Sequence, residues 1–290
     1  MKTISPTTAQ LRMLASVKSQ TWLIRPEAVQ NFAMSALEAS EKTEVERSDA
    51  YLEQFYNLRQ AAFIDADGIA HIQIVGALLF SCPAIYEKLG LATRYETLIA
   101  EIEGAEAAGA KAILFHVDSP GGTVAGVIEA GEAIASVGIP TAAHCHGLAC
   151  SAAYWLTAGT QAVFASPSAT VGNIGAIISW ADCSKFWEDM GITFKALTSE
   201  GADLKSTFHL EPDEAQLAFL QASIDEAGAQ FRDHVTAGRT AAGAELDPEV
   251  FRAGWYSGET AWNLGLVDSQ ATAEQARQYL ITSLQVETTV

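Results

Sequence analysis

Short apolar runs alternate with longer amphipathic segments over most of this 290-residue chain. The runs have the length and polar flanks of buried strands, and the segments between them show helical periodicity. Strands are predicted at 61–64, 69–79, 111–119, 139–147, 161–165 and 192–198. Helices are predicted at 26–38, 45–60, 94–109, 123–136, 151–159, 182–190 and 211–238. Repeated strand–helix units with short connections indicate an α/β fold with a parallel or mixed sheet covered by helices.

The longest uncharged stretch runs from residue 133 to residue 181. Its length raises the question of a membrane-spanning helix. Proline, glycine and polar residues interrupt it every few positions, so we expect the centre of a buried α/β core instead. The first twenty residues also lack the continuous apolar stretch of a signal peptide. We therefore predict no membrane anchor.

The chain is acidic, with 35 Asp and Glu against 17 Lys and Arg, which gives a formal net charge of −18. This charge disfavours binding to nucleic-acid phosphates and to anionic membrane surfaces. The four cysteines, Cys82, Cys145, Cys150 and Cys183, form no CxxC pair and predict reduced thiols. We expect a globular cytoplasmic protein without a nucleic-acid partner.

The motif DSPGGTVAG, residues 118–126, stands where a buried strand gives way to a helix. In open α/β sheets, ligand sites form at this carboxyl edge. Gly121 and Gly122 allow a sharp bend and a close backbone approach, and adjacent amides at such a turn can bind an oxyanion. An ordinary strand–helix turn explains the motif equally well when it is taken alone.

Ser151 has two interpretations. The strand before it is expected to end near Gly147, so Ser151 falls at the start of the next helix, where serine is a common N-cap. Its hydroxyl would also stand at the same sheet edge as Gly121 and Gly122, as a nucleophile beside amides that stabilise an oxyanion. Cys150, its neighbour, is a second candidate nucleophile in the same segment.

A serine nucleophile needs a base, because a free hydroxyl is nearly inert at neutral pH. His144 and His146 alternate along one strand, and with Cys145 and Cys150 nearby they also raise the question of a metal site. Cys145 points to the other face and no carboxylate completes the cluster, so histidines satisfied by local hydrogen bonds are the simpler interpretation.

Lysine is the other candidate base. The lysines after Ser151 are Lys185, Lys195 and Lys205. The first is predicted on a solvated helix and the second in a strand, whereas Lys205 follows a polar turn. A lysine that acts as a base must be neutral, so its pKa must be lowered by desolvation. A loop folded over an uncharged surface would remove water from the lysine in this way. A surface lysine remains the alternative for Lys205.

Five motifs follow one another along the chain in this order: HVDSPGGTVAG, GLACSAAYW, ATVGNIGAIIS, a lysine after a glycine-containing turn, and YSGETAWNLGLVD. Over roughly residues 65–270 they resemble the S49 peptidase family, the signal peptide peptidase A group. Within it they look most like the capsid and prohead maturation proteases of bacteriophages. The stretch TWLIRPEAVQNF is more weakly similar to that branch.

The resemblance implies a crotonase-like, Clp-protease-like α/β fold with stacked strand–helix units and C-terminal helices. It also implies a Ser–Lys dyad of Ser151 and Lys205, with an oxyanion hole formed by an amide of Gly121 or Gly122 and by the amide of Ala152. No metal or organic cofactor is implied. The stretch SPSATVGNIGAI contains no histidine, which disfavours a Ser–His–Asp triad of the Clp type.

The implied domains are a mostly helical extension at 1–60, a peptidase domain at 61–275 and a tail at 276–290. The implied substrate is a polypeptide, either a scaffold or capsid protein in the host cytoplasm or procapsid, or a target of a cytoplasmic housekeeping peptidase. A homo-oligomer is expected, with 211–238 as a helix able to pack between subunits. An acyl-CoA enzyme of the crotonase type and a catalytically inactive assembly protein are the alternatives from other classes.

Overall fold

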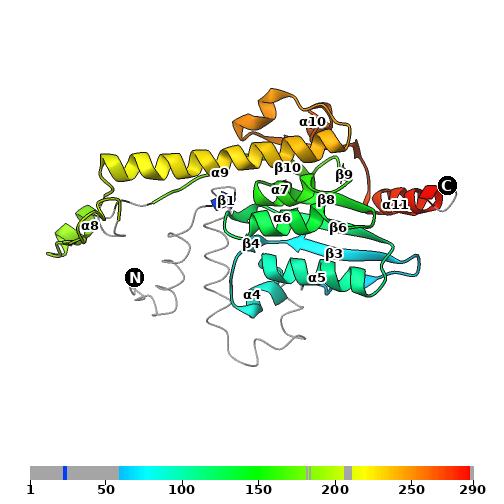
Figure 1. Ribbon diagram of the computed structural model, residues 1–290, viewed down its shortest axis with the longest axis horizontal. Helices are drawn as coiled ribbons and strands as arrows, with labels where there is room; N and C mark the ends of the chain where they lie inside the picture. The colour runs from blue at the N-terminus through cyan, green and yellow to red at the C-terminus, as the bar shows by residue number, and fades with distance from the viewer. Residues whose placement is uncertain (1–21, 25–58, 181, 183, 206–210, 288–290) are drawn as a thin grey trace, which may run out of the picture.

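Two β-sheets form the centre of the computed structural model, which describes residues 22–24, 59–180, 182, 184–205 and 211–287 (Figure 1). The strands are β1 (Trp22–Ile24), β2 (Phe63–Ile64), β3 (Ile69–Val75), β4 (Ala77–Leu79), β5 (Ala92–Arg94), β6 (Ala112–Ser119), β7 (Gly121–Thr123), β8 (Thr141–Cys150), β9 (Ala162–Ala165), β10 (Thr170–Gly172), β11 (Trp255–Ser257) and β12 (Ser269–Gln270). The smaller sheet has the order β1-β7-β4-β5. The larger runs β11-β10-β8-β6-β3-β2, with β9 beside β8 and β12 beside β9.

Helices cover both faces of the larger sheet. They are α4 (Ala84–Lys88), α5 (Tyr95–Ala107), α6 (Val127–Ala135), α7 (Ala152–Ala158), α8 (Ser184–Asp189), α9 (Glu214–Ala241), α10 (Gly258–Asn263) and α11 (Ala273–Glu287), with a 3-10 turn, η2 (Pro248–Arg252). On the central parallel strand β6, Phe115 packs in the core with α5, α6 and α7, whereas Leu114 packs with α11. Burial on both faces explains the nearly continuous apolar sequence. The predicted α/β class is confirmed.

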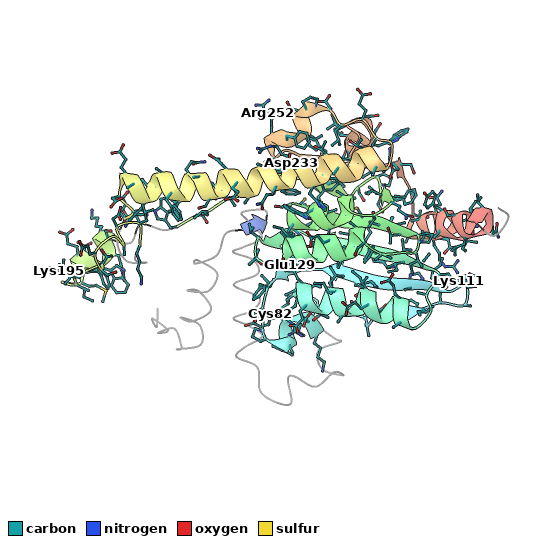
Figure 2. All side chains as sticks on the ribbon, viewed as in Figure 1. Cys82, Lys111, Glu129, Lys195, Asp233 and Arg252 are labelled. Carbon is teal, nitrogen blue, oxygen red and sulfur yellow. The ribbon has the colours of Figure 1, made fainter. Side chains whose placement is uncertain are left out.

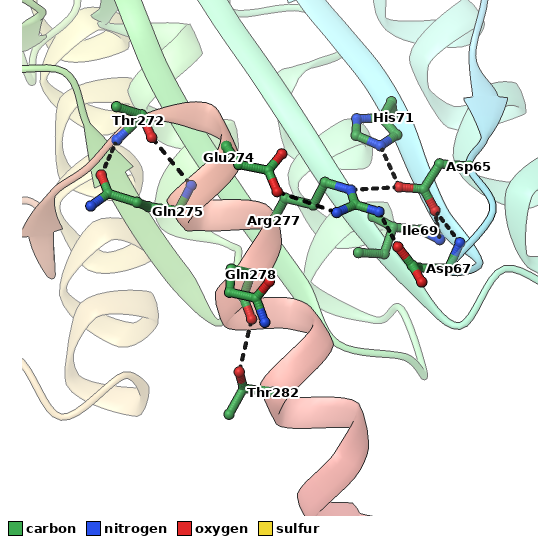
Figure 3. Close-up of polar contacts among 10 residues, drawn as sticks. All are labelled: Asp65, Asp67, Ile69, His71, Thr272, Glu274, Gln275, Arg277, Gln278 and Thr282. Atoms are coloured by element: carbon green, nitrogen blue, oxygen red, sulfur yellow. Dashed lines mark hydrogen bonds and ion pairs between the residues drawn. The ribbon is translucent and has the colours of Figure 1, made fainter.

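The C-terminal helix α11 is fixed to the sheet through Arg277 (Figure 3). Its Nε donates a hydrogen bond to Asp65 Oδ2 at 2.7 Å, and its Nη2 donates to Asp67. His71 Nε2 lies 3.2 Å from the same Asp65 oxygen. The network links the β2–β3 turn to α11. This helix includes residue 276, where the predicted tail begins. The division into domains stays a prediction.

Helix α9 extends well beyond the sheets (Figure 1). It begins with a capping box between Asp213 and Gln216, which satisfies backbone groups at its start. Its C-terminal part packs on α7, where Phe231 is buried and His234 Nε2 lies 3.0 Å from the Trp155 carbonyl oxygen. The opposite end of α9 lies beside α8, away from the sheets. No helix within the described ranges has both the length and the apolar character needed to cross a membrane.

Most predicted elements are confirmed. The turn at 65–68 joins β2 and β3 in an antiparallel pair, and α5, α6, α7 and α9 lie where helices were expected. The strand predicted at 192–198 is wrong: this segment is irregular. It has strand-like composition, but it lies near α8, away from both sheets, and no strand of the described part of the chain pairs with it. The helix predicted at 26–38 falls outside the described residues, and so does the helix predicted at 45–60 except for residues 59 and 60, which are not helical.

Candidate active site

Strand β8 carries the chain past Gly147, its predicted end, to Cys150. The absence of a side chain at Gly147 lets Asp118 approach this strand closely, because a Cβ there would lie 2.2 Å from Asp118 Oδ1. The same oxygen accepts a hydrogen bond from the Leu148 amide at 2.9 Å. The extended end of β8 then pairs in parallel with β10. Ser151 therefore follows directly on a paired strand.

Ser151 occupies a sharp strand-to-helix turn. Its φ is 57° and its ψ is −123°, a combination that L-residues rarely adopt. Two backbone hydrogen bonds hold it there: its amide donates to the Gly172 carbonyl at 2.8 Å, and its own carbonyl accepts from the Trp155 amide at 2.9 Å. Such strain costs about 1–3 kcal/mol and persists only where the surroundings enforce it.

The Ser151 side chain is buried, with 1% of its surface exposed. Its hydroxyl has no hydrogen-bond partner among the described residues, and it makes no capping bond to α7. A buried unpaired hydroxyl costs about 1–3 kcal/mol, so the position is not explained by helix capping or packing. The observation favours the nucleophile interpretation over the N-cap.

The glycine pair lies on β7, which is in contact with α7. Gly122 pairs with Leu78 of β4, and a Cβ at Gly122 would lie only 1.8 Å from the Leu78 carbonyl oxygen. Gly121 has a φ of 106°, and its amide donates to Ser119 Oγ at 3.2 Å. The Gly121 amide thus already has a side-chain acceptor, and the choice between the two glycines as oxyanion donor stays a prediction. Ala152, the other predicted donor, opens α7 and is buried.

Lys205 is placed in a different region from Ser151. It is exposed, and its amide donates to the Ala202 carbonyl at 3.1 Å within a turn. That turn contacts the start of α9, where Gln216 Nε2 donates to the Asp203 carbonyl at 3.0 Å. Trp155, in the helix that follows Ser151, packs on Phe231, which lies past the middle of α9. From residue 216 to residue 231 an α-helix rises about 22 Å.

The structure of one chain therefore brings Ser151, Ala152 and the β7 glycines together, but it does not bring Lys205 to them. Lys185 and Lys195 are exposed as well, and Figure 2 shows Lys195 at the far end of α9. Lys195 lies in an irregular segment, not in the predicted strand. The assignment of the base stays a prediction.

The strand histidines form a separate network on the α11 face of the sheet. His71 Nδ1 lies 2.9 Å from His116 Nε2, and His144 Nε2 lies 3.0 Å from the Ala271 carbonyl oxygen. Burial, together with the neighbouring histidines, lowers the pKa of His116 to about 4. Within the part of the chain that the structure describes, no group of three His, Cys, Asp or Glu side chains could hold a metal ion.

Cys150 is fully buried, and its thiol donates to the Thr170 carbonyl at 3.5 Å. This contact fits a packing role. Asn173, which sequence reasoning missed, supports the turn from the other side. It has a φ of 57°, its amide donates to the Gly254 carbonyl at 2.6 Å, and its side chain donates to the Ala253 carbonyl at 2.9 Å. Asparagine after glycine in ATVGNIG was the available signal, because asparagine tolerates the left-handed conformation.

Comparison with known proteins matches residues 133–287, just over half of the chain, to the family model described as peptidase family S49. The matched range includes Ser151, Ala152 and Lys205. It begins after the glycine pair.

Two curated relatives show the range of the match. Protein slr0021 of Synechocystis sp., named as a candidate protease, is 31% identical over 173 residues, which cover 59% of this chain and 62% of that protein. Capsid assembly protease C of Escherichia phage lambda is 28% identical over 217 residues, which cover 72% of this chain and 48% of the phage protein. The chain thus spans less than two thirds of either relative.

One solved structure, a membrane-bound stomatin-specific protease in complex with a substrate peptide, aligns with 69% of this chain and 74% of its own. The TM-score is 0.39 and the sequence identity is 16%.

Proposed function

Because the chain belongs to peptidase family S49, we propose that it is a serine endopeptidase in which Ser151 is the nucleophile. One observation carries the proposal: Ser151 is held in a strained turn beside the β7 glycines, and its buried hydroxyl has no hydrogen-bond partner in the described part of the chain. Packing does not account for this arrangement. A nucleophile, in contrast, needs a hydroxyl that is free to attack and backbone amides nearby.

The proposed reaction passes through an acyl-enzyme. Neutral Lys205 takes the Ser151 proton as the hydroxyl oxygen attacks the scissile carbonyl. The amides of Gly122 and Ala152 stabilise the resulting oxyanion. The protonated lysine then gives its proton to the leaving amine as the C–N bond breaks, and a water molecule hydrolyses the ester to restore Ser151.

We propose further that Lys205 reaches Ser151 of a second copy of the chain. Within one chain, the turn that contains Lys205 contacts the start of α9 at Gln216, whereas the helix that follows Ser151 packs on Phe231, further along α9. The region around Lys205 also exposes many large apolar side chains, namely Trp180, Phe186, Met190, Ile192, Leu197, Leu204, Leu217 and Phe219. Such a concentration is typical of an interaction surface. Contact with another subunit would cover these side chains and exclude water from the lysine, as a neutral base requires.

The proposed substrate is a polypeptide of a phage head, cleaved in the host cytoplasm or the procapsid. The support is the similarity to capsid assembly protease C, which aligns with 72% of this chain. A cytoplasmic housekeeping peptidase is the alternative, and the genes beside this one decide between them: portal and major capsid genes support the phage role.

Cleavage of casein by the wild type, Ser151→Ala and Lys205→Ala tests the proposed chemistry. We expect both variants to lose cleavage and Lys195→Ala, which removes another exposed lysine of the same region, to keep it. Cleavage by both Ser151→Ala and Lys205→Ala at the wild-type rate would contradict the dyad. A wild type that cleaves neither casein nor a capsid scaffold would support an inactive assembly protein.

A further inference from the structure

Strand β1 comes from the N-terminal part of the chain and lies against the candidate active site. It pairs antiparallel with β7 in a register that places Leu23 opposite Gly122, with Trp22 opposite Thr123 and Ile24 opposite Gly121. Gly121 and Gly122 are the two predicted oxyanion donors of this strand. A segment remote in sequence therefore covers the backbone that a substrate carbonyl would approach.

Without β1, β7 would be an edge strand, because the order of the smaller sheet is β1-β7-β4-β5. An edge strand presents unpaired backbone groups, which an extended peptide can bind by adding a strand to the sheet. Strand β7 also contacts α7, the helix that Ser151 opens. An extended polypeptide on this edge would run past the nucleophile.

We infer that residues 22–24 act as a built-in pseudosubstrate, which occupies the β7 edge and must leave before an extended polypeptide can bind there for cleavage. The inference rests on the proposed function, since it assumes that Ser151 attacks a peptide bound on this edge. It goes further by naming the segment of this chain that competes with the substrate.

The chemistry of the pairing suits a replaceable strand. Two of the three β7 residues are glycines, so binding to this edge depends mainly on the backbone and tolerates different sequences. β1 has only three residues, and a backbone hydrogen bond contributes about 0.5–1.5 kcal/mol net. A substrate that makes the same bonds over a longer stretch can therefore displace it.

The test uses Leu23→Pro in the full chain, with Leu23→Val as the matched control. Proline removes the backbone N–H at the centre of β1 and disfavours strand pairing, whereas valine keeps both. We expect Leu23→Pro to speed hydrogen exchange at the β7 amides and to lower the KM for casein by about tenfold. Leu23→Val should match the wild type in both measurements.

A synthetic peptide of residues 19–27 supplies a second measurement that does not depend on how the variant folds. We expect it to inhibit casein cleavage by the wild type competitively, and to inhibit Leu23→Pro at lower concentration. It should also slow exchange at the β7 amides of that variant.

Three outcomes would overturn the inference. The first is an unchanged KM in a folded Leu23→Pro variant, and the second is a Leu23→Pro variant in which both the activity and the unfolding temperature fall. The third is no inhibition by the peptide at millimolar concentration. Failure of the proposed function looks different. In that case no Ser151-dependent cleavage appears in the wild type or in either Leu23 variant.

Discussion

The two residues of the proposed dyad lie in regions that differ in almost every physical respect. Ser151 is buried between a paired strand and a packed helix, in a backbone conformation fixed by hydrogen bonds on both sides. Lys205 is exposed in a turn beside the free end of α9. A single chain thus brings together the proposed nucleophile and the proposed oxyanion amides, and leaves the proposed base outside that site.

If the chain assembles as we propose, this difference separates the part of the site that depends on assembly from the part that does not. A nucleophile fixed by the core of one chain is present in every folded monomer, whereas a base on an exposed, apolar-rich surface becomes useful when another subunit covers that surface. The following predictions test the difference between the two regions.

Ser151→Ala is expected to have the largest effect on activity. Loss of the nucleophile should lower kcat/KM for casein roughly 10³-fold or more. The unfolding temperature should stay the same or rise slightly, because the hydroxyl that is removed makes no hydrogen bond to any residue that the structure describes. Enzyme assays and thermal melts measure the two effects, with Cys150→Ala as the control that keeps activity. Loss of activity in Cys150→Ala with Ser151→Ala still active would move the nucleophile to the thiol.

Lys205→Ala is expected to separate activity from stability most clearly. Loss of a general base typically costs about 10²–10⁴-fold in rate. The stability of the monomer should not change, because the side chain is exposed. Initial rates and urea unfolding of Lys205→Ala and Lys195→Ala provide the comparison. Equal activity in the two variants would exclude Lys205 as the base.

Gly122→Ala and Gly201→Ala compare the packing of the two regions. The added Cβ at Gly122 meets the Leu78 carbonyl oxygen at 1.8 Å, so we expect a loss of about 3 kcal/mol or more in unfolding free energy. Gly201, close to Lys205, has open space and a φ of +75°, so strain alone should cost about 1 kcal/mol. Urea unfolding measures both losses, and similar values would contradict the contrast in packing.

The last expected effect is a loss of stability in acid that arises in the sheet and not in the Lys205 region. Burial and the neighbouring histidines lower the pKa of His116 from 6.5 to about 4. Between these values the unfolded chain binds more protons than the folded one, so the unfolding free energy falls as the pH falls from 6.5 towards 4. Urea unfolding against pH should show a weaker slope in His116→Gln, and an unchanged slope would contradict the assignment.

Much of the fold followed from local sequence patterns. Apolar runs were sufficient to predict β6 and β9, and helical periodicity was sufficient to predict α5 and α9. In each case the burial of an apolar face determines the element. The segment 192–198 shows the limit, since its composition suits a strand but pairing requires a neighbour that it lacks. The pairing of β1 with β7 joins segments far apart in the chain, and no local pattern encodes it.

The candidate site likewise has features that the sequence predicts and features that it does not. Ser151 and the β7 glycines could be found from small residues at predicted strand ends, although the strain at Ser151 could not, because it depends on Gly172 and Asp118 from other strands. The position of Lys205 relative to Ser151 could not be predicted at all. It is set by the length and direction of α9, which the residues around the lysine do not specify.

The most direct test of the shared site is to mix Ser151→Ala and Lys205→Ala, each inactive alone, and to measure casein cleavage after the subunits have exchanged. If Lys205 of one copy serves Ser151 of another, random mixing of equal amounts should restore about a quarter of the wild-type sites. If each chain builds its site from its own residues, every site lacks one member and the mixture stays inactive. That result would contradict the account.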